Sequence, residues 1–277
     1  MKKYAFLRFP EFKRKAVTLS YDDGTKYDEK FIGILNKYGL KATFNINSGL
    51  FYPDGDEKRM SASEAVSLYK NSGHEVAVHG AKHLSLAEVP PEVACRDIIE
   101  DRIALEKLFG KIIRGMAYAN GSYTDKVVEM LKICGIKYAR TTVSTERFDI
   151  PEDWLRLPAT CHHNNPRLIQ LAEEFLKSPE SGIFWQNTPR LFYLWGHSYE
   201  FHNNDNWEVI EKFAEKTGNR EDVWYATNGE IYDYVRAYDK LEYSVENNII
   251  KNASDQEVYL CFYGNNIKVP AGKEIII

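Results

Sequence analysis

The chain has 277 residues, of which 44% are hydrophobic and 27% are charged, and its net charge is −4 at pH 7. This composition is typical of a globular protein with one large core, or with one core and a small appendage. The acidic balance argues against a nucleic-acid-binding protein, which usually has a basic face. No segment approaches the roughly 20 apolar residues that a membrane-spanning helix needs. We therefore expect neither a nucleic-acid partner nor a membrane span, and the oligomeric state stays open.

Along residues 15–238, apolar segments typical of strands alternate with amphipathic segments typical of helices. The expected strands span 15–21, 41–47, 74–79, 113–119, 136–142, 190–196 and 222–226. The expected helices span 27–39, 61–73, 91–110, 124–135, 166–177, 206–218 and 230–238. Because each helix connects neighbouring strands, the alternation predicts a parallel α/β sheet. The number of units favours a closed or nearly closed barrel over an open doubly wound sheet, and periodicity alone does not decide between them.

The pattern changes after about Leu241, where short β-rich runs are separated by Asn, Ser, Asp, Pro and Gly. We expect residues 1–240 to form the barrel and residues 241–277 to form a small β-rich extension packed on it. The first 15 residues lack the apolar core of a signal peptide. This predicts a cytoplasmic protein, whereas a secreted or cell-envelope location is expected if an export signal was trimmed.

The four cysteines form no Cys-x-x-Cys pair, which argues against a structural zinc site made of thiolates. We expect these isolated cysteines to be buried free thiols.

Two adjacent carboxylates, Asp22 and Asp23, follow the first expected strand in the stretch "TLSYDDG". In a parallel α/β barrel, catalytic groups lie just past the carboxyl ends of strands, although Asp-Asp-Gly at such a place is also a common turn. His79 and His83 follow another expected strand, and their spacing lets both imidazoles converge on one ion. Together these residues supply two imidazoles and a carboxylate for a divalent transition metal, with a second carboxylate free to accept a proton.

His197 also follows an expected strand and is a candidate proton donor for a leaving group. The run "CHHNN" at 161–165 is expected to be a polar loop, with a part in a substrate wall as the alternative.

With these motifs, the chain resembles the polysaccharide deacetylase family, also called the NodB-homology domain or carbohydrate esterase family four, over about residues 15–238. The family motif T-F-D-D-G is matched by "LSYDDG", H-[ST]-x-x-H by "HGAKH" and Leu-x-His by "LWGH". The resemblance implies a distorted (β/α)₇ barrel of the NodB type. It also implies that Asp22 is the catalytic base, that Asp23, His79 and His83 are metal ligands, and that His197 is the general acid.

The chain departs from the family pattern in two places. Gly80 replaces the Ser or Thr of the second motif, and Ala117 replaces the arginine that holds the catalytic aspartate ionised. We expect Arg140 on the neighbouring strand to supply this cation, since Arg114 lies too deep. Asp153, in a possible counterpart of the family's Asp-Trp element, is a candidate for polarising His197.

The resemblance further implies a metal-dependent hydrolase that removes acetyl groups from an N-acetylated sugar or polysaccharide, with Zn²⁺ as the first choice of ion and Co²⁺, Ni²⁺ or Fe²⁺ as alternatives. Candidate substrate-binding residues are Tyr118, Asn120, Trp195 and Tyr199. Three other functions stay open. They are an O-acetyl glycan esterase using the same site, a weakly active or non-catalytic carbohydrate-binding relative, and a metal-free amide hydrolase on the same barrel.

Overall fold

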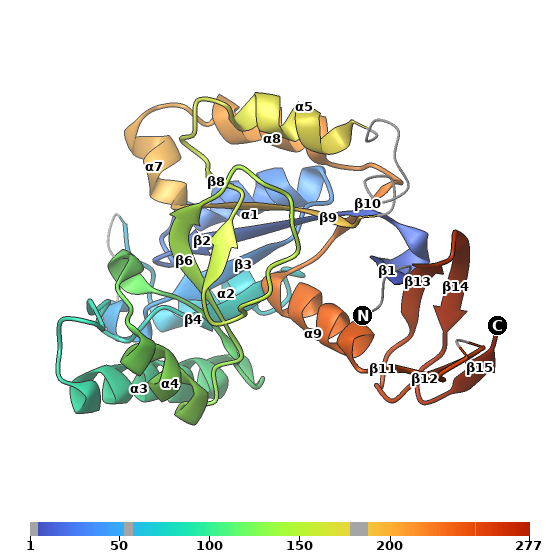
Figure 1. The fold of residues 1–277 in the computed structure, drawn as a ribbon. Coiled ribbons are helices and arrows are strands. Elements are labelled where there is room, and N and C mark those ends of the chain that lie inside the picture. Colours follow the sequence, from blue (N-terminus) through green and yellow to red (C-terminus); the bar gives the residue numbers. More distant parts are fainter. Residues whose placement is uncertain (1–4, 53–57, 178–187, 247) are drawn as a thin grey trace.

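A sheet of parallel strands forms the centre of the computed structural model, which describes residues 5–52, 58–177, 188–246 and 248–277 (Figure 1). The strand order is β7-β6-β5-β4-β3-β2-β9-β8, and β10 pairs with β2. The strands are β2 (Lys15–Asp22), β3 (Ala42–Ile46), β4 (Glu75–Val78), β5 (Gly115–Ala117), β6 (Tyr138–Ser144), β7 (Leu157–Ala159), β8 (Cys161–His162), β9 (Arg190–Gly196) and β10 (Val223–Tyr225).

The two ends of this sheet are joined by a single stretch of chain. β7 pairs with β6, β8 pairs with β9, and only Thr160 separates β7 from β8. The backbone N–H of Thr160 donates to the carbonyl of Tyr193 on β9 at 2.8 Å. The stretch 157–162 therefore closes the sheet, which confirms the predicted distorted (β/α)₇ barrel. The expectation of a polar loop at 161–165 was wrong for its first two residues, because pairing to β9 satisfies their backbone.

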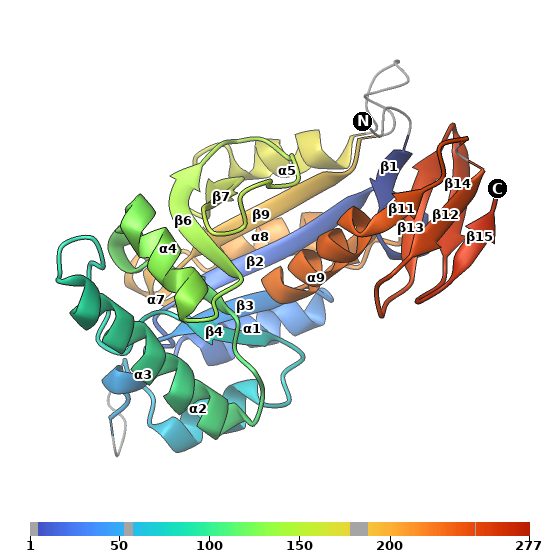
Figure 2. The ribbon, with the colours of Figure 1, turned by 60° about the horizontal axis from the view of Figure 1, so that its bottom comes forward.

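Helices surround the sheet (Figures 1 and 2), and the expected ones are all present. Their bounds are α1 (Asp28–Lys37), α2 (Ala62–Tyr69), α3 (Pro91–Phe109), α4 (Asp125–Ile133), α5 (Leu168–Leu176), α7 (Ser198–Asn203), α8 (Glu208–Thr217) and α9 (Asn228–Asp239). α7 is an additional short helix, and single 3₁₀ turns occupy Pro10–Phe12, Ser48–Leu50 and Ala119–Gly121. α2 and α9 begin with complete capping boxes, at Ser61 and Thr227.

Aromatic side chains fill much of the space between the helices and the sheet. Phe31, Phe44, Phe192, Phe201 and Phe213 are all fully buried. Each such ring contributes roughly 1.5–3 kcal/mol through burial. This packing makes the barrel a rigid support for side chains at its rim.

The C-terminal segment forms two small antiparallel sheets beside α9 (Figures 1 and 2). One has the order β1-β13-β14 and the other β11-β12-β15. Their strands are β1 (Ala5–Arg8), β11 (Leu241–Tyr243), β12 (Ile249–Asn252), β13 (Val258–Phe262), β14 (Asn265–Val269) and β15 (Glu274–Ile276). The N-terminal strand β1 thus pairs with β13 instead of joining the barrel sheet. The division at residue 240 stays a prediction.

All four cysteines are free thiols, and the Sγ atoms of Cys95 on α3 and Cys134 after α4 lie 3.6 Å apart. Among the helices of the described residues, none is both long and apolar enough to cross a membrane.

Candidate metal and active site

The predicted site residues lie on strands of the barrel sheet or directly after them. Asp22 ends β2, His79 follows β4, and Ala117 ends β5. Arg140 lies on β6, and His197 follows β9. Because all these strands run in the same direction, their carboxyl ends share one rim, where the barrel geometry gathers the side chains.

Asp22 is a buried carboxylate with two polar partners. Its Oδ1 accepts a hydrogen bond from Asn45 Nδ2 at 2.8 Å, and its Oδ2 forms an ion pair with Arg140. Burial raises the pKa of Asp22, but the charges of Arg140, His79 and His197 outweigh burial and hold this pKa at about 2. The carboxylate is therefore ionised across the whole physiological pH range.

Arg140 reaches Asp22 from the position directly beside Ala117. The two residues are paired neighbours in the β5–β6 ladder, and both are fully buried. The Arg140 guanidinium also stacks on the Trp195 ring, with its carbon 4.4 Å from the ring centroid. The cation that the family pattern places on one strand is thus present on the next strand. Arg114 instead pairs with Asp233 on α9 at 2.7 Å.

Asp23 has a left-handed backbone, with φ of +79°, and Gly24 follows with φ of +61°. In a regular strand, successive side chains point to opposite faces. The left-handed turn changes this alternation, and carboxylate oxygens of both Asp22 and Asp23 lie 3.7 Å from His79 Nε2. Aspartate is among the few residues that adopt this conformation readily.

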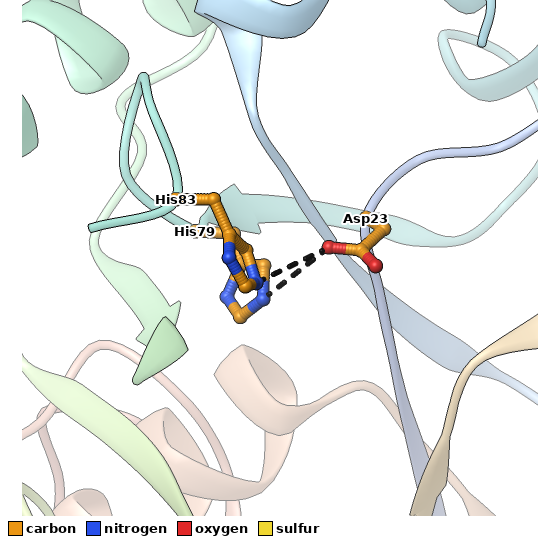
Figure 3. A group of neighbouring side chains, drawn as sticks. All are labelled: Asp23, His79 and His83. Atoms are coloured by element: carbon orange, nitrogen blue, oxygen red, sulfur yellow. Dashed lines mark ion pairs between the residues drawn. The ribbon is translucent and has the colours of Figure 1, made fainter. Parts of the chain in front are cut away.

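The two imidazoles of His79 and His83 lie against each other and face the Asp23 carboxylate (Figure 3). Asp23 Oδ1 is 3.5 Å from His83 Nε2 and 3.7 Å from His79 Nε2. His79 Nδ1 is 2.9 Å from the carbonyl of Ala117, so it carries the proton and donates to that oxygen. The Nε2 lone pair of His79 then faces the cluster.

These three residues fit a divalent metal ion. Their candidate ligand atoms all lie within 4.8 Å of one another. Asp23 Oδ1 is buried and accepts no hydrogen bond, and such an orphaned acceptor costs free energy unless a cation occupies the space beside it. Two neutral imidazoles and one carboxylate are the donor set of many catalytic zinc sites.

His197 also lies beside Asp22, with its Nε2 3.9 Å from the Oδ2 atom that His79 faces. Its Nδ1 is 3.3 Å from Glu200 Oε1, one turn along α7. Burial lowers the pKa of His197, but the contact with Glu200 and the charges of Asp22 and Asp23 outweigh burial and raise this pKa above its ordinary value. Asp153 instead pairs with Arg156 at 2.7 Å, so the expectation that Asp153 polarises His197 was wrong. Glu200 is the acidic residue beside His197 Nδ1.

Glu200 also contacts two further imidazoles. Its Oε2 lies 3.3 Å from His162 Nε2 and 2.8 Å from His163 Nε2. The backbone N–H of Asn164 donates to His162 Nδ1, so the proton of neutral His162 is on Nε2 and points toward Glu200. A metal ion between these groups would need that proton removed. Glu200 therefore lies within 3.3 Å of a ring nitrogen of each of three imidazoles, and its pKa lies far below the ordinary range because these contacts outweigh burial.

The four predicted substrate-binding residues have different environments. Tyr118 is 1% exposed, and its hydroxyl donates to the carbonyl of Leu155, so the expectation that its ring meets substrate is corrected to a place in the core. Asn120 is exposed and donates to Ser85 Oγ. Trp195 and Tyr199 are partly exposed beside the site, and the Tyr199 ring lies 5.1 Å from that of His197.

Two residues of this site were missed by the sequence reasoning, Glu200 and Asn45. Glu200 lies three residues after His197, a spacing that places both on one face once the segment is helical. Asn45 lies in the apolar strand "KATFNIN", where a buried amide is a signal because polar side chains are rare in such strands.

Comparison with known proteins identifies related folds. A family model described as polysaccharide deacetylase matches residues 10–139. Among curated proteins, no sequence matches the chain.

Three solved structures are similar to this one. A Mycobacterium smegmatis protein described as a candidate polysaccharide deacetylase is 15% identical with a TM-score of 0.57, and the alignment covers 86% of this chain and 96% of that one. The peptidoglycan deacetylase PdaC from Bacillus subtilis is 16% identical with a TM-score of 0.51, covering 82% and 94%. An activity-restored mutant of a Bacillus anthracis family 4 carbohydrate esterase pseudoenzyme is 15% identical with a TM-score of 0.50, covering 82% and 70%. At these identities the likeness shows the fold.

Proposed function

We propose, from the match of residues 10–139 to the polysaccharide deacetylase family, that the chain is a metal-dependent hydrolase that removes acetyl groups from an N-acetylated sugar. One observation carries the proposal. An ionised carboxylate, a three-residue metal-ligand cluster and an imidazole with a raised pKa converge at one rim of the barrel. Amide hydrolysis needs these three groups, namely a base, an electrophile and an acid.

Asp23, His79 and His83 would hold the ion. A bound divalent metal ion would polarise the acetyl carbonyl and lower the pKa of a water molecule. Asp22 is a weak base because its pKa is about 2. It is nevertheless ionised, and its Oδ2 lies 3.7 Å from His79 Nε2, next to the metal-ligand cluster. In the proposed reaction, water attacks the acetyl carbon, Asp22 accepts a proton from that water, and the carbon–nitrogen bond breaks.

His197 supplies the proton that the leaving nitrogen requires. Glu200 contacts its Nδ1, which keeps a proton there and leaves Nε2 directed toward Asp22. The raised pKa of His197 keeps the imidazole protonated to higher pH than an ordinary histidine. The products are acetate and the free amino sugar. Trp195 and Tyr199, which are partly exposed near His197, are the aromatic rings proposed to contact the sugar.

Two alternatives use the same residues. An O-acetyl esterase is compatible because an alkoxide leaves more readily than an amine. The hypothesis of a non-catalytic carbohydrate-binding protein was based on the absence of an arginine at position 117. The Arg140–Asp22 ion pair weakens this hypothesis, because it supplies the missing cation.

Acetate release from chitooligosaccharides, peptidoglycan fragments and acetylated xylan distinguishes these functions. We expect release from N-acetylated glycans, loss of release after chelation, and recovery with Zn²⁺. Release from acetylated xylan alone would favour the esterase. Bound metal with no release from any glycan would favour the binding protein.

His79→Ala tests the ligand assignment. We expect loss of both metal stoichiometry and activity, with the circular dichroism spectrum retained, because the imidazole that faces Asp23 is removed. Asp22→Asn is the matched variant, since it should keep the metal and lose turnover. Full metal content in His79→Ala would contradict the proposed ligands, and an active Asp22→Asn enzyme would remove Asp22 as the base.

A further inference from the structure

Two buried carboxylates on α3, Asp97 and Asp101, face the metal-ligand loop, residues 79–83. They are 3% and 0% exposed and lie one helical turn apart. Two like charges at this spacing destabilise a helix, and a buried carboxylate costs still more unless hydrogen bonds compensate it. Neither side chain forms a salt bridge with a lysine or arginine among the described residues. Their partners are instead backbone N–H groups of the loop and of its neighbour.

Asp101 accepts hydrogen bonds through both oxygens. Oδ2 accepts from the backbone N–H of His79 at 3.0 Å, and Oδ1 accepts from the backbone N–H of Ser48 at 2.7 Å. The same carboxylate thus ties the start of the metal-ligand loop to the segment after β3. Asn47, in that segment, donates to the carbonyls of His79 and Gly80 at 2.9 and 2.8 Å.

Asp97 holds the middle of the loop. Its Oδ1 accepts from the backbone N–H of Lys82 at 2.9 Å, and its own carbonyl accepts from the N–H of Ala81 at 3.3 Å. Its Oδ2 lies against Gly80, where an added Cβ would come within 2.5 Å of it. Gly80 has φ of +81°, so glycine is required here by conformation and by space together.

From these contacts we infer that Asp97 and Asp101 are positioning residues for the metal site. They fix the backbone between His79 and His83, and thereby the direction of both imidazoles toward Asp23. Outer partners of this kind typically change metal affinity by about 10- to 100-fold when removed. This inference rests on the proposed metal site, but it concerns metal affinity and does not depend on the substrate.

The test is the Zn²⁺ affinity of four full-length variants, measured by competition with a chromophoric chelator. Asp101→Asn should weaken binding by about 10-fold or more, because an amide has one acceptor oxygen for two N–H groups. Asp97→Ala should weaken binding similarly, whereas Asp97→Asn should stay near wild type, since one oxygen still accepts from Lys82. Glu100→Gln removes the same charge from the same helix at a site paired only with Arg96 in the described contacts, and should leave the affinity unchanged.

Wild-type Zn²⁺ affinity in both Asp97→Ala and Asp101→Asn would overturn the inference. Equal weakening in Asp97→Asn, Asp97→Ala and Glu100→Gln would also overturn it, because helix charge would then explain the effect. Thermal unfolding of the metal-free variants shows whether a loss of Zn²⁺ affinity reflects a changed loop or a less stable protein. If Asp101→Asn does not fold, the comparison of Asp97→Ala with Asp97→Asn tests the inference. A wild-type protein that binds Zn²⁺ through His79 but releases no acetate would refute the proposed function and leave this inference standing.

Discussion

Arg140 and Asp22 form the buried ion pair on which the proposed chemistry depends. Arg140 is fully buried, and among the described residues its ion-pair partner is Asp22. A buried pair gains little over an apolar pair of similar shape, but removing one partner leaves an uncompensated charge. The pair is therefore better explained by the need for an ionised Asp22 than by stability.

Arg140→Met should destabilise the fold by about 3–5 kcal/mol and raise the pKa of Asp22 from its value of about 2. A depressed pKa keeps Asp22 ionised until the pH falls through it, so losing the cation moves the acid limb of the activity profile to higher pH. Urea unfolding and a pH–rate profile measure the two effects. Arg140→Lys keeps a charge and should show a smaller shift, and an unchanged acid limb in Arg140→Met would contradict this account.

Glu200→Gln should lower the pKa of His197, because the contact with Glu200 is what mainly opposes burial there. The general acid works while it is protonated, so activity is lost as the pH rises through its pKa. The alkaline limb of the profile should therefore move to lower pH in Glu200→Gln. Glu215→Gln, at an exposed position of α8, is the control. An alkaline limb that stays in place would show that Glu200 does not act through His197.

At the scale of elements, the stretch 157–162 both closes the barrel and positions the histidines that contact Glu200, the partner of His197. His163 follows β8 and is 1% exposed, and its ring stacks on Tyr21 and packs on Phe201. The adjacent β9 makes room for it at Gly196, where an added Cβ would lie 2.0 Å from His163 Nδ1. Closing the barrel therefore also places two histidines against Glu200.

Gly196→Ala should displace His163 and cost about 1–3 kcal/mol of stability, the usual effect of inserting a methyl group into a packed core. Activity should fall with it, because Glu200 loses a fixed partner. Gly33→Ala is the matched control, since Gly33 is exposed on α1 and an added Cβ meets no atom within 4 Å. That change should instead stabilise the protein by about 0.5–1 kcal/mol. Urea unfolding compares the two, and equal stability would contradict the steric argument.

At the scale of the whole molecule, the N-terminal strand and the C-terminal sheets share a core with α9. Tyr234 and Tyr238 of α9 donate to the carbonyls of Arg8 and Ala5 at 2.7 and 2.9 Å. Leu260 on β13 is fully buried and pairs with Leu7 of β1. The C-terminal strands therefore contribute to the packing of an element that also lies against the barrel sheet.

A chain ending at Lys240 should lose several kcal/mol of stability, because each large apolar side chain that loses its burial costs roughly 1.5–3 kcal/mol. β1 would also lose its pairing with β13. Thermal unfolding of the full and shortened chains measures the loss, and acetate release shows whether the rim is affected. Two independent transitions in the full chain, with the barrel transition unchanged in the shortened one, would contradict a shared core.

Local patterns in the sequence were sufficient for the alternating elements, the Asp22–Asp23 pair and the His79–His83 spacing, since each depends on residues close together in the chain. The closed barrel was favoured by the number of units and implied by the family resemblance. Tertiary structure decided the rest. The family resemblance led to the expectation of Arg140 as the cation for Asp22, but the contact spans 118 residues and its geometry depends on strand register. Glu200 becomes the partner of His162 and His163 only because residues 157–162 close the barrel. Such contacts depend on strand register and helix placement, which arise when distant segments pack, and no short-range spacing encodes them. For the same reason Tyr118, which follows a strand like the other candidates, faces the core, and Asp97 and Asp101 were recognised only once α3 lay against the metal-ligand loop.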